Sequence, residues 1–443
     1  MGPKASLTLT ALLLTSAMPA SARAVATAEM KTVPGDMARR TRELVSILNG
    51  RGEPQRTFTK TFLADVPEPK LRAINASVID QLGQAIGIMS ITPRGTGRAD
   101  LLIGYEKGTA HAVVVLAPDG KIGGFVIDQL QRADIAALTT LDQVTQAFAQ
   151  LPGAAAFVVT EIASGSEPQA ALDPDRPLAI GSTFKLVILA ELVRSIDAGE
   201  RRWSDTVTLG TLELPSGGFD QVAPGTKVTL RALAEAMIRV SDNSATDLLL
   251  HELGRRRVEG MLGPVGFSYA DANMPLLSTL ELFKLKGIDG GALGQRYLTL
   301  NPLERQRMLD GEVARLPGSA IDRRYAEGRP VLIDGLEWFA SPDDLVRTMA
   351  WFARHADTPA GGEALRILAL NPGPATDTRA QFAYVGYKGG SEPGVISETV
   401  LVRDKVASWK VVSATWNDPA AAVDEFRFDA LVAKALAILA GKS

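Results

Sequence analysis

Ser182 and Lys185 stand three residues apart at the start of a strongly apolar stretch, residues 180–190, with the sequence IGSTFKLVILA. Apolar residues around its whole circumference indicate a helix that is buried on every side. At a spacing of three the two side chains share one helix face, so the lysine can reach the hydroxyl from one turn below. Burial lowers the pKa of a lysine and lets it accept a proton at neutral pH. The pair predicts a serine nucleophile with its own base; the alternative is a helix N-cap followed by a solvated lysine.

Two further short motifs follow in the chain. Ser241-Asp242-Asn243 lies between two amphipathic segments and predicts a loop between helices, because Asp and Asn cap helices and tie turns. Lys388-Gly389-Gly390-Ser391 lies in residues 382–391, which read as a strand. Two glycines inside a strand indicate a bulge, or the close approach of another backbone or a ligand.

Composition excludes several kinds of chemistry. The chain has no cysteine, which rules out disulfides, iron–sulfur ligation and thiolate catalysis. The three histidines, His111, His251 and His355, are scattered and outside any metal-ligand spacing, so we expect structural roles for them, no metal site and no cofactor. A Ser-His-Asp site is therefore disfavoured, which favours a lysine as the base for the serine. With a net charge of −3 and no basic blocks, nucleic acid is not an expected partner.

The first residues predict an export signal. Lys4 provides a positive start, residues 7–16 are mostly apolar, and Ala20-Ser21-Ala22 forms a small-residue cleavage site. We expect a signal peptide over 1–22 and a periplasmic or secreted mature protein. The apolar part is short for a membrane span, and no later segment is long enough, so we expect no transmembrane anchor after cleavage. An uncleaved anchor is the alternative.

Hydrophobic periodicity divides the rest into two α+β parts. Residues 23–140 predict helices over 35–50 and 68–82, then strands over 86–91, 99–106, 110–116 and 121–127, with helices on one sheet face. This order resembles NTF2-like or cystatin-like architectures. Residues 141–443 predict a helix over 141–150, a strand over 154–160, several helices, a strand over 382–391, strands over 395–402 and 408–415, and a terminal helix over 424–439.

The three motifs occur together in a known order. Ser182-x-x-Lys185, Ser241-Asp242-Asn243 and Lys388-Gly389-Gly390 resemble the motif trio of class A β-lactamases and penicillin-binding proteins. The resemblance covers residues 141–443. It implies an antiparallel sheet flanked by helices, with an all-helical subdomain. The two-part layout also resembles the β-lactamase-like protein of the clavulanic acid pathway and its relatives.

The resemblance implies roles for the motif residues. Ser182 would attack a carbonyl with Lys185 as its base, and Ser241 would relay a proton toward the leaving nitrogen. Lys388 would lower the pKa of Lys185 and attract an anionic substrate. The backbone N–H groups of Ser182 and Ser391 would form the oxyanion hole. The remaining motif residues would bind substrate or, for Asp242, tie the loop: Asn243, Gly389, Gly390 and Ser391 are the substrate-binding set.

The sequence departs from that family pattern at two places. Gly389 stands where Thr or Ser usually helps to hold a substrate carboxylate, and Ser391, two residues along the same strand face, is a partial replacement. A Glu-x-x-Leu-Asn loop, whose glutamate activates the deacylating water, does not occur between residues 243 and 388. The pair Leu300-Asn301 has Tyr297 in the glutamate position, while Glu327 and Glu337 stand in the wrong pattern. A divergent insertion then leads to a helix start at residues 341–344.

We therefore expect an exported serine hydrolase that forms an acyl-enzyme on Ser182 with a small β-lactam, ester or amide, and that deacylates slowly. One alternative is a D-alanyl-D-alanine carboxypeptidase or another peptidoglycan-directed enzyme that uses the same serine. The other is a non-catalytic binding protein with a decayed hydrolase site. The intact set Ser182, Lys185, Ser241 and Lys388 argues against full decay.

Overall fold

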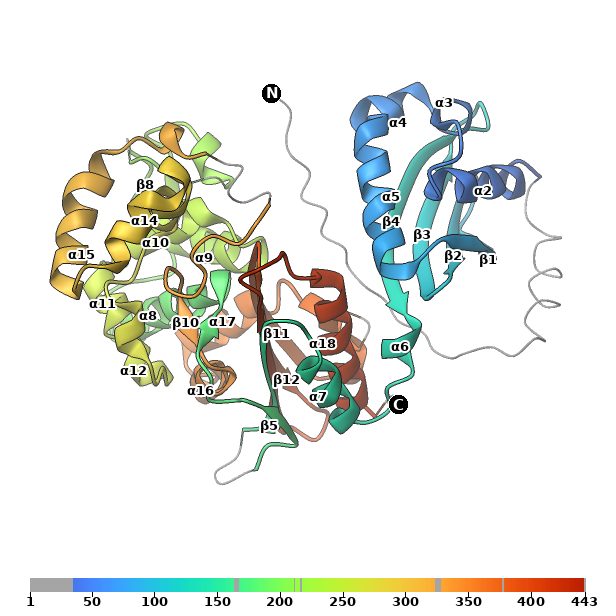
Figure 1. Cartoon of the computed structure of the whole chain (residues 1–443). Helices are drawn as coiled ribbons and strands as arrows, with labels where there is room; N and C mark the ends of the chain where they lie inside the picture. The colour runs from blue at the N-terminus through green and yellow to red at the C-terminus, as the bar shows by residue number, and fades with distance from the viewer. Residues whose placement is uncertain are drawn as a thin grey trace. The chain divides into compact units, whose positions relative to one another are not determined.

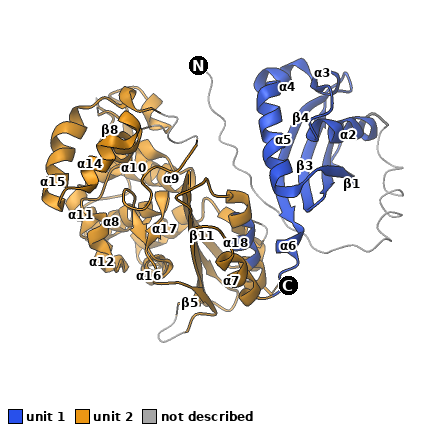
Figure 2. Cartoon of the chain, in the orientation of Figure 1, with its two compact units in different colours: residues 1–139, 429–434, 443 blue, residues 140–428, 435–442 orange. Residues whose placement is uncertain are grey.

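A computed structural model describes residues 35–162, 167–210, 212–215, 217–322, 328–376 and 378–441. The expected signal peptide lies outside these residues. The chain separates into two compact units, coloured in Figure 2: residues 1–139 with 429–434 and 443, and residues 140–428 with 435–442. Within the described residues, no helix combines the length and the apolar character that a bilayer crossing requires.

Unit 1 consists of helices followed by an antiparallel four-stranded sheet in the order β1-β2-β3-β4. Helix α5 lies along the sheet (Figure 1). The predicted helices and strands are confirmed, and three short helices, α3, α4 and α6, were not predicted. The elements are α2 (Gly35–Leu48), α3 (Pro54–Thr57), α4 (Lys60–Asp65), α5 (Glu68–Leu82), β1 (Ala85–Pro93), β2 (Arg98–Tyr105), β3 (Gly108–Leu116), β4 (Ile122–Arg132) and α6 (Ala133–Ala136).

Unit 2 is built on an antiparallel five-stranded sheet in the order β11-β12-β13-β5-β6, which confirms the predicted sheet. The last three strands, β11 to β13, join the early strand β5 through the pairing of β13 with β5, so the sheet combines strands from both ends of the unit. Strand β11 is an edge strand, and one row of its backbone groups is free of sheet pairing. The strands are β5 (Ala154–Glu161), β6 (Ala170–Leu172), β11 (Tyr384–Glu392), β12 (Val395–Arg403) and β13 (Trp409–Asn417).

Helices flank this sheet, and most of them gather on one side of it (Figure 1). They are α7 (Leu141–Ala149), α8 (Lys185–Asp197), α9 (Leu230–Arg239), α10 (Asn243–Leu253), α11 (Arg255–Glu259), α12 (Leu262–Val265), α13 (Thr279–Gly287), α14 (Ala292–Leu298), α15 (Pro302–Met308), α16 (Pro342–Arg354), α17 (Pro359–Leu368) and α18 (Glu425–Leu439). Two small antiparallel ribbons pair β7 (Leu178–Ala179) with β10 (Phe339–Ala340) and β8 (Thr206–Thr208) with β9 (Lys227–Thr229). The α+β fold class is confirmed.

Helix α8 is the centre of the unit 2 core. Every residue from Lys185 to Val193 is buried, as the apolar stretch predicted. The α-helix begins later than the motif, however. Ser182 lies in a 3₁₀ turn, η2 (Gly181–Phe184), and Lys185 is the first residue of α8. The tighter turn changes the direction in which the serine side chain leaves the backbone.

Candidate active site

The turn that carries Ser182 is packed tightly against edge strand β11. A Cβ built on Gly390 would lie 2.5 Å from the carbonyl oxygen of Ile180 and 2.7 Å from the backbone nitrogen of Thr183, and would overlap the backbone nitrogen of Ser182. A Cβ on Gly181, whose φ is +49°, would lie 3.3 Å from the nitrogen of Ser391. The β11–β12 register contains no bulge, so the glycines in this strand serve a close approach of two backbones.

Lys185 is fully buried and its ammonium group faces the Ser241 loop. Its Nζ donates to the carbonyl oxygen of Ser241 at 2.7 Å, to Ser241 Oγ at 3.1 Å and to Asn243 Oδ1 at 2.8 Å. All three oxygens lie within hydrogen-bond distance of the same nitrogen. Among the hydrogen bonds of the described residues, none joins Lys185 to Ser182, so the spacing of three does not by itself produce the direct pairing that we expected.

The Ser241 hydroxyl lies between two lysines. Its Oγ is 3.1 Å from Nζ of Lys185 and 3.1 Å from Nζ of Lys388, which also donates to the carbonyl oxygen of Gly389. Ser241 adopts a left-handed backbone conformation with φ of +54°. This conformation costs a non-glycine residue free energy, so the surrounding structure holds the hydroxyl in place against local preference.

Burial lowers the affinity of both lysines for a proton. Desolvation, with a further contribution from the charge of Lys388, lowers the pKa of Lys185 well below its ordinary value. Desolvation lowers the pKa of Lys388 to about 7. Lys388 can therefore exchange a proton near neutral pH, and Lys185 holds its proton less tightly than an exposed lysine does. Asp247, which sequence reasoning missed, opposes this shift at Lys185. Its carboxylate is anchored by the backbone nitrogens of Thr279 and Leu280 at 2.7 and 2.9 Å.

The loop that presents Ser241 is fixed by Asp242. Its Oδ1 accepts from the backbone nitrogen of Ala245 at 2.8 Å and caps α10, while Oδ2 accepts from the backbone nitrogen of Gly218 at 2.5 Å. These contacts tie the helix start to the segment around Gly218. Asn243 begins α10, and its side chain is held by Lys185.

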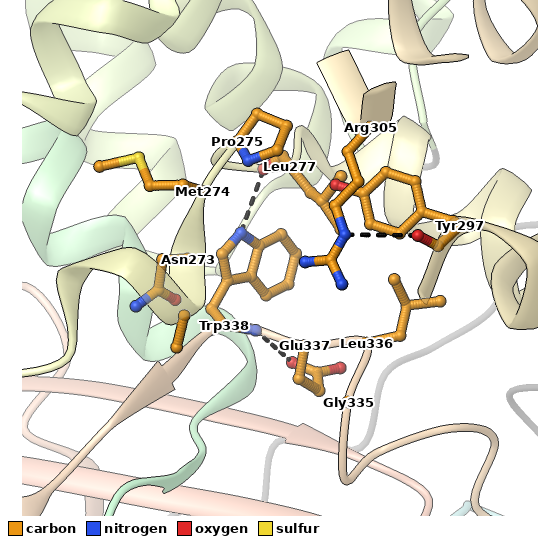
Figure 3. Close-up of a pocket in the computed structure, with 11 residues that line it drawn as sticks. Asn273, Met274, Pro275, Leu277, Tyr297, Arg305, Gly335, Leu336, Glu337 and Trp338 are labelled. Atoms are coloured by element: carbon orange, nitrogen blue, oxygen red, sulfur yellow. Dashed lines mark hydrogen bonds between the residues drawn. The ribbon is translucent and has the colours of Figure 1, made fainter. Parts of the chain in front are cut away.

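Trp338, in the segment before α16, supports the Ser182 turn. Trp338 stacks on Phe184 with ring centroids 3.8 Å apart, and its carbonyl oxygen accepts from the backbone nitrogen of Ile180 at 2.9 Å. Figure 3 shows the Trp338 indole pointing toward Leu277, to whose carbonyl oxygen its Nε1 donates at 3.1 Å. The cavity beside it has about 10 Å³, room for about one water molecule. A larger cavity of about 380 Å³ lies elsewhere, around Arg176, and Ser182 lines neither.

The residues that were compared with the missing Glu-x-x-Leu-Asn loop have structural roles or lie outside the described residues. Tyr297 is buried in α14, Asn301 caps α15 through the backbone nitrogen of Glu304, and Glu327 lies outside the described residues. Glu337 forms a buried ion pair with Lys286, whose Nζ lies 2.7 Å from Oε1 and also contacts Glu392.

Sequence reasoning also missed two side chains beside Gly389. A Cβ at this position would overlap the phenol oxygen of Tyr387, which therefore occupies the volume of the expected Thr or Ser side chain. That hydroxyl donates to Glu398 Oε1 at 2.8 Å. Glu398 stands directly opposite Gly389 on β12. The pairing of β11 with β12 brings Tyr387 and Glu398 to Gly389. In the sequence, only the alternation of faces along a predicted hairpin could have indicated this neighbourhood.

The histidines and acidic residues make no metal centre in the described part of the chain. His111 pairs with Asp128 on the sheet of unit 1, at 2.5 Å, and His355 stacks on Trp351 at the end of α16. His251 is exposed on α10. None of the three contacts the Ser182 region through a hydrogen bond of the described residues.

A sequence model described as the Beta-lactamase enzyme family matches residues 139–418, well over half of the 443 residues. The chain belongs to the beta-lactamase enzyme family. All three motifs lie within the matched range, together with every strand of the five-stranded sheet, while helix α18 lies beyond it.

Individual relatives of this beta-lactamase family member are distant. Beta-lactamase ROB-1 of Haemophilus influenzae is 37% identical over 81 residues, which are 18% of this chain and 26% of the relative. ROB-1 of Mannheimia haemolytica matches to the same extent. The match thus spans about a quarter of the length of these curated relatives.

Solved structures also match about two thirds of the chain. The β-lactamase of Sphaerobacter thermophilus DSM 20745 is 20% identical with a TM-score of 0.47, and covers 68% of this chain and 96% of its own. An ancestral (GNCA) class A β-lactamase is 18% identical with a TM-score of 0.47, over 68% of this chain and 98% of its own. PBP-A is 18% identical with a TM-score of 0.44, and the match covers 67% of this chain and 94% of PBP-A.

Proposed function

We propose that this protein is an exported serine hydrolase that forms an acyl-enzyme on Ser182 with a β-lactam, ester or amide. The observation that carries the proposal is the Ser241 hydroxyl held 3.1 Å from both Lys185 and Lys388. Two buried amines with lowered pKa values, joined by one hydroxyl, form a path for protons next to the turn that bears Ser182.

The reaction begins when Ser182 Oγ attacks the substrate carbonyl and its proton passes to the neutral amine of Lys185. A C–O bond forms and the carbonyl electron pair moves to the oxygen, which accepts from the backbone N–H groups of Ser182 and Ser391. The tetrahedral species then breaks its bond to the leaving nitrogen or oxygen. Ser241 passes a proton to that atom and is reprotonated by Lys185. Because catalytic hydrogen bonds often form only in the complex with substrate, Lys185 turns from Ser241 toward Ser182 for the first proton transfer.

Deacylation is the slow half of the proposed cycle. Water attack on the ester needs a general base at the acyl carbonyl. The Glu337 carboxylate is held by Lys286 in the core, Tyr297 lies in α14, and Asn301 caps α15. The acyl-enzyme is therefore expected to accumulate. Export is also part of the proposal and rests on the sequence of residues 1–22 alone.

Intact-protein mass spectrometry tests the proposal. The protein is incubated with benzylpenicillin, a cephalosporin and a neutral fluorophosphonate, and the adduct mass is followed over time. We expect one adduct per chain in the wild type, none in Ser182→Ala, and an unchanged adduct in the matched control Ser268→Ala, an exposed serine near Arg347.

A second variant, Lys185→Arg, keeps the positive charge but holds its proton too tightly to act as a base. Its acylation rate is expected to fall at least ~1,000-fold. Equal labelling of wild type and Ser182→Ala would refute the nucleophile. Absence of any adduct at saturating probe would favour the non-catalytic binding protein.

A further inference from the structure

An acidic corner lies on the strand face next to Gly389. It consists of Tyr387, Glu398, Ser391 and Glu425. The Glu398 side chain is 4% exposed, and its Oε1 accepts from Tyr387 at 2.8 Å. Its second oxygen, Oε2, is buried without a hydrogen-bond partner among the described residues. A buried carboxylate with one oxygen unsatisfied is costly, so a donor that carries positive charge would be bound favourably beside it.

A second carboxyl group adds to the same charge. Glu425 begins α18 and interacts with the side chain of Ser391. Desolvation and the charge of Glu425 raise the pKa of Glu398 to about 7, although the Tyr387 hydrogen bond acts against this. The pKa of Glu425 is raised too, first by desolvation. The two carboxylates therefore repel each other, and each would gain from a cation placed nearby.

Basic side chains in the described part of the chain do not supply that cation. There, neither Glu398 nor Glu425 forms an ion pair with a lysine or arginine, and Arg427, two residues along α18, pairs with neither. Lys388 extends from the opposite face of β11, where its Nζ is bound to Ser241 and to the carbonyl oxygen of Gly389. The negative charge of the corner is therefore not compensated by a basic side chain of the described residues.

Tyr387 decides which ligands the corner can bind. Its hydroxyl hydrogen is donated to Glu398, so the phenol oxygen offers only acceptor capacity to a ligand. A substrate carboxylate at Gly389 would meet this oxygen and two like charges, with no side-chain hydroxyl at position 389 to donate to it. A protonated amine would donate to the phenol oxygen and relieve the repulsion between Glu398 and Glu425.

We propose that the substrate of Ser182 carries a protonated amine, not a carboxylate, in the subsite formed by Gly389, Ser391 and the acidic corner. The inference rests on the proposed acylation of Ser182. It disfavours the D-alanyl-D-alanine peptidase alternative, because that substrate ends in a carboxylate.

Three probes that share one penam ring test the charge preference. They carry at the ring carboxyl position the free carboxylate, the neutral N-methylamide or the cationic 2-aminoethylamide. Acylation rates are measured by intact-protein mass spectrometry at about pH 8.5, where Glu398 is ionised and an aliphatic amine is still protonated. We expect the cationic probe to acylate at least ~10-fold faster than the carboxylate probe, with the neutral probe between them.

Variants of the acidic corner test whether its residues cause the preference for the cationic probe. Glu398→Gln and, separately, Glu425→Gln should each reduce the ratio of cationic to carboxylate rates by ~3- to 10-fold or more. Tyr387→Phe should lower the rate with the cationic probe. Glu252→Gln, on the exposed end of α10 beside Arg201, is the matched charge control and should leave the ratio unchanged. Thermal melting checks that each variant is folded. If Glu398→Gln does not fold, the ratio measured for Glu425→Gln decides the test.

The outcomes separate the two proposals. If the neutral fluorophosphonate labels Ser182 but the carboxylate probe reacts as fast as the cationic one, the acidic-corner inference is wrong and the acyl-enzyme proposal stands. The inference is equally wrong if the ratio is unaltered in both glutamate variants. If neither the fluorophosphonate nor any penam labels Ser182, both proposals fall.

Discussion

Ser241 Oγ and Lys388 Nζ lie 3.1 Å apart although 147 residues separate them in the chain. Ser241 comes from the loop between α9 and α10, and Lys388 from the edge strand β11. The same oxygen is 3.1 Å from Lys185 at the start of α8. One hydroxyl thus joins three separate elements of the site.

Ser241→Ala should lower the acylation rate by ~100- to 1,000-fold, because it removes the hydrogen-bonded link between the two amines. Ser241→Gly should lower it to the same extent, yet leave the protein about 1 kcal/mol more stable than Ser241→Ala, since glycine accepts the left-handed backbone at φ of +54°. Mass-spectrometric acylation rates and urea unfolding check the two effects. Normal acylation in either variant would remove Ser241 from the proton path.

Gly390→Ala tests the contact between β11 and the Ser182 turn. The new Cβ would overlap the backbone at Ser182 and lie 2.5 Å from the carbonyl oxygen of Ile180, so strand and turn must move apart. We expect acylation to fall at least ~100-fold, because the backbone nitrogens of Ser182 and Ser391, which we propose as the oxyanion hole, move with these backbones.

The control for this variant is Gly263→Ala in α12, where a Cβ would meet no atom within 4 Å. It should acylate at the wild-type rate. A Gly390→Ala protein that acylates like the control would contradict the proposed oxyanion hole.

Stability should depend on pH through Lys388. Its pKa is about 7 in the folded protein, against an ordinary value of 10.5 in the unfolded chain. Between pH 7 and 10.5 the unfolded chain binds more protons, so the free energy of unfolding rises with pH in this window. Lys185, whose pKa is lowered too, contributes with the same sign.

Lys388→Met removes one of these two contributions. The variant's unfolding free energy should rise less steeply, by at most about 1.4 kcal/mol per pH unit. The free energy of unfolding of the variant should exceed that of the wild type most below pH 7, where the buried Lys388 of the wild type is charged. Urea unfolding at a series of pH values measures the slopes, and equal slopes for both proteins would show that Lys388 does not titrate as described.

Glu337→Ala should destabilise the fold by about 3–5 kcal/mol, because it leaves Lys286 buried with only Glu392 as a counter-charge. Glu252→Ala removes an exposed glutamate 3.7 Å from Arg201 and should cost at most about 1 kcal/mol. Urea unfolding of the two variants compares these costs. Similar small losses for both would mean that the buried pair contributes little.

Local patterns predicted most of the elements. The apolar stretch after Ser182 predicted a helix buried on every side, and alternation predicted strands β1 to β5 and β11 to β13, because periodicity of side chains reports which face is buried. The two- and three-residue strands β6 to β10 were not predicted. The short helices α3, α4 and α6 were not predicted, since a segment of four to six residues has too few positions to show a period. Helix α8 begins three residues after Ser182 because the motif's first turn is 3₁₀ rather than α.

By itself, the sequence determined the residue types of the site and their order along the chain: Ser182 with Lys185, the Ser241 loop, and the glycine-containing strand after Lys388. Tertiary structure alone decided which atoms meet. It bonded Lys185 to Ser241, with no hydrogen bond to Ser182 among the described residues, and it placed Tyr387 and Glu398 beside Gly389. The reason is physical: hydrogen bonds across 56 or 147 residues depend on how helices and strands pack. Local periodicity carries no information about that packing.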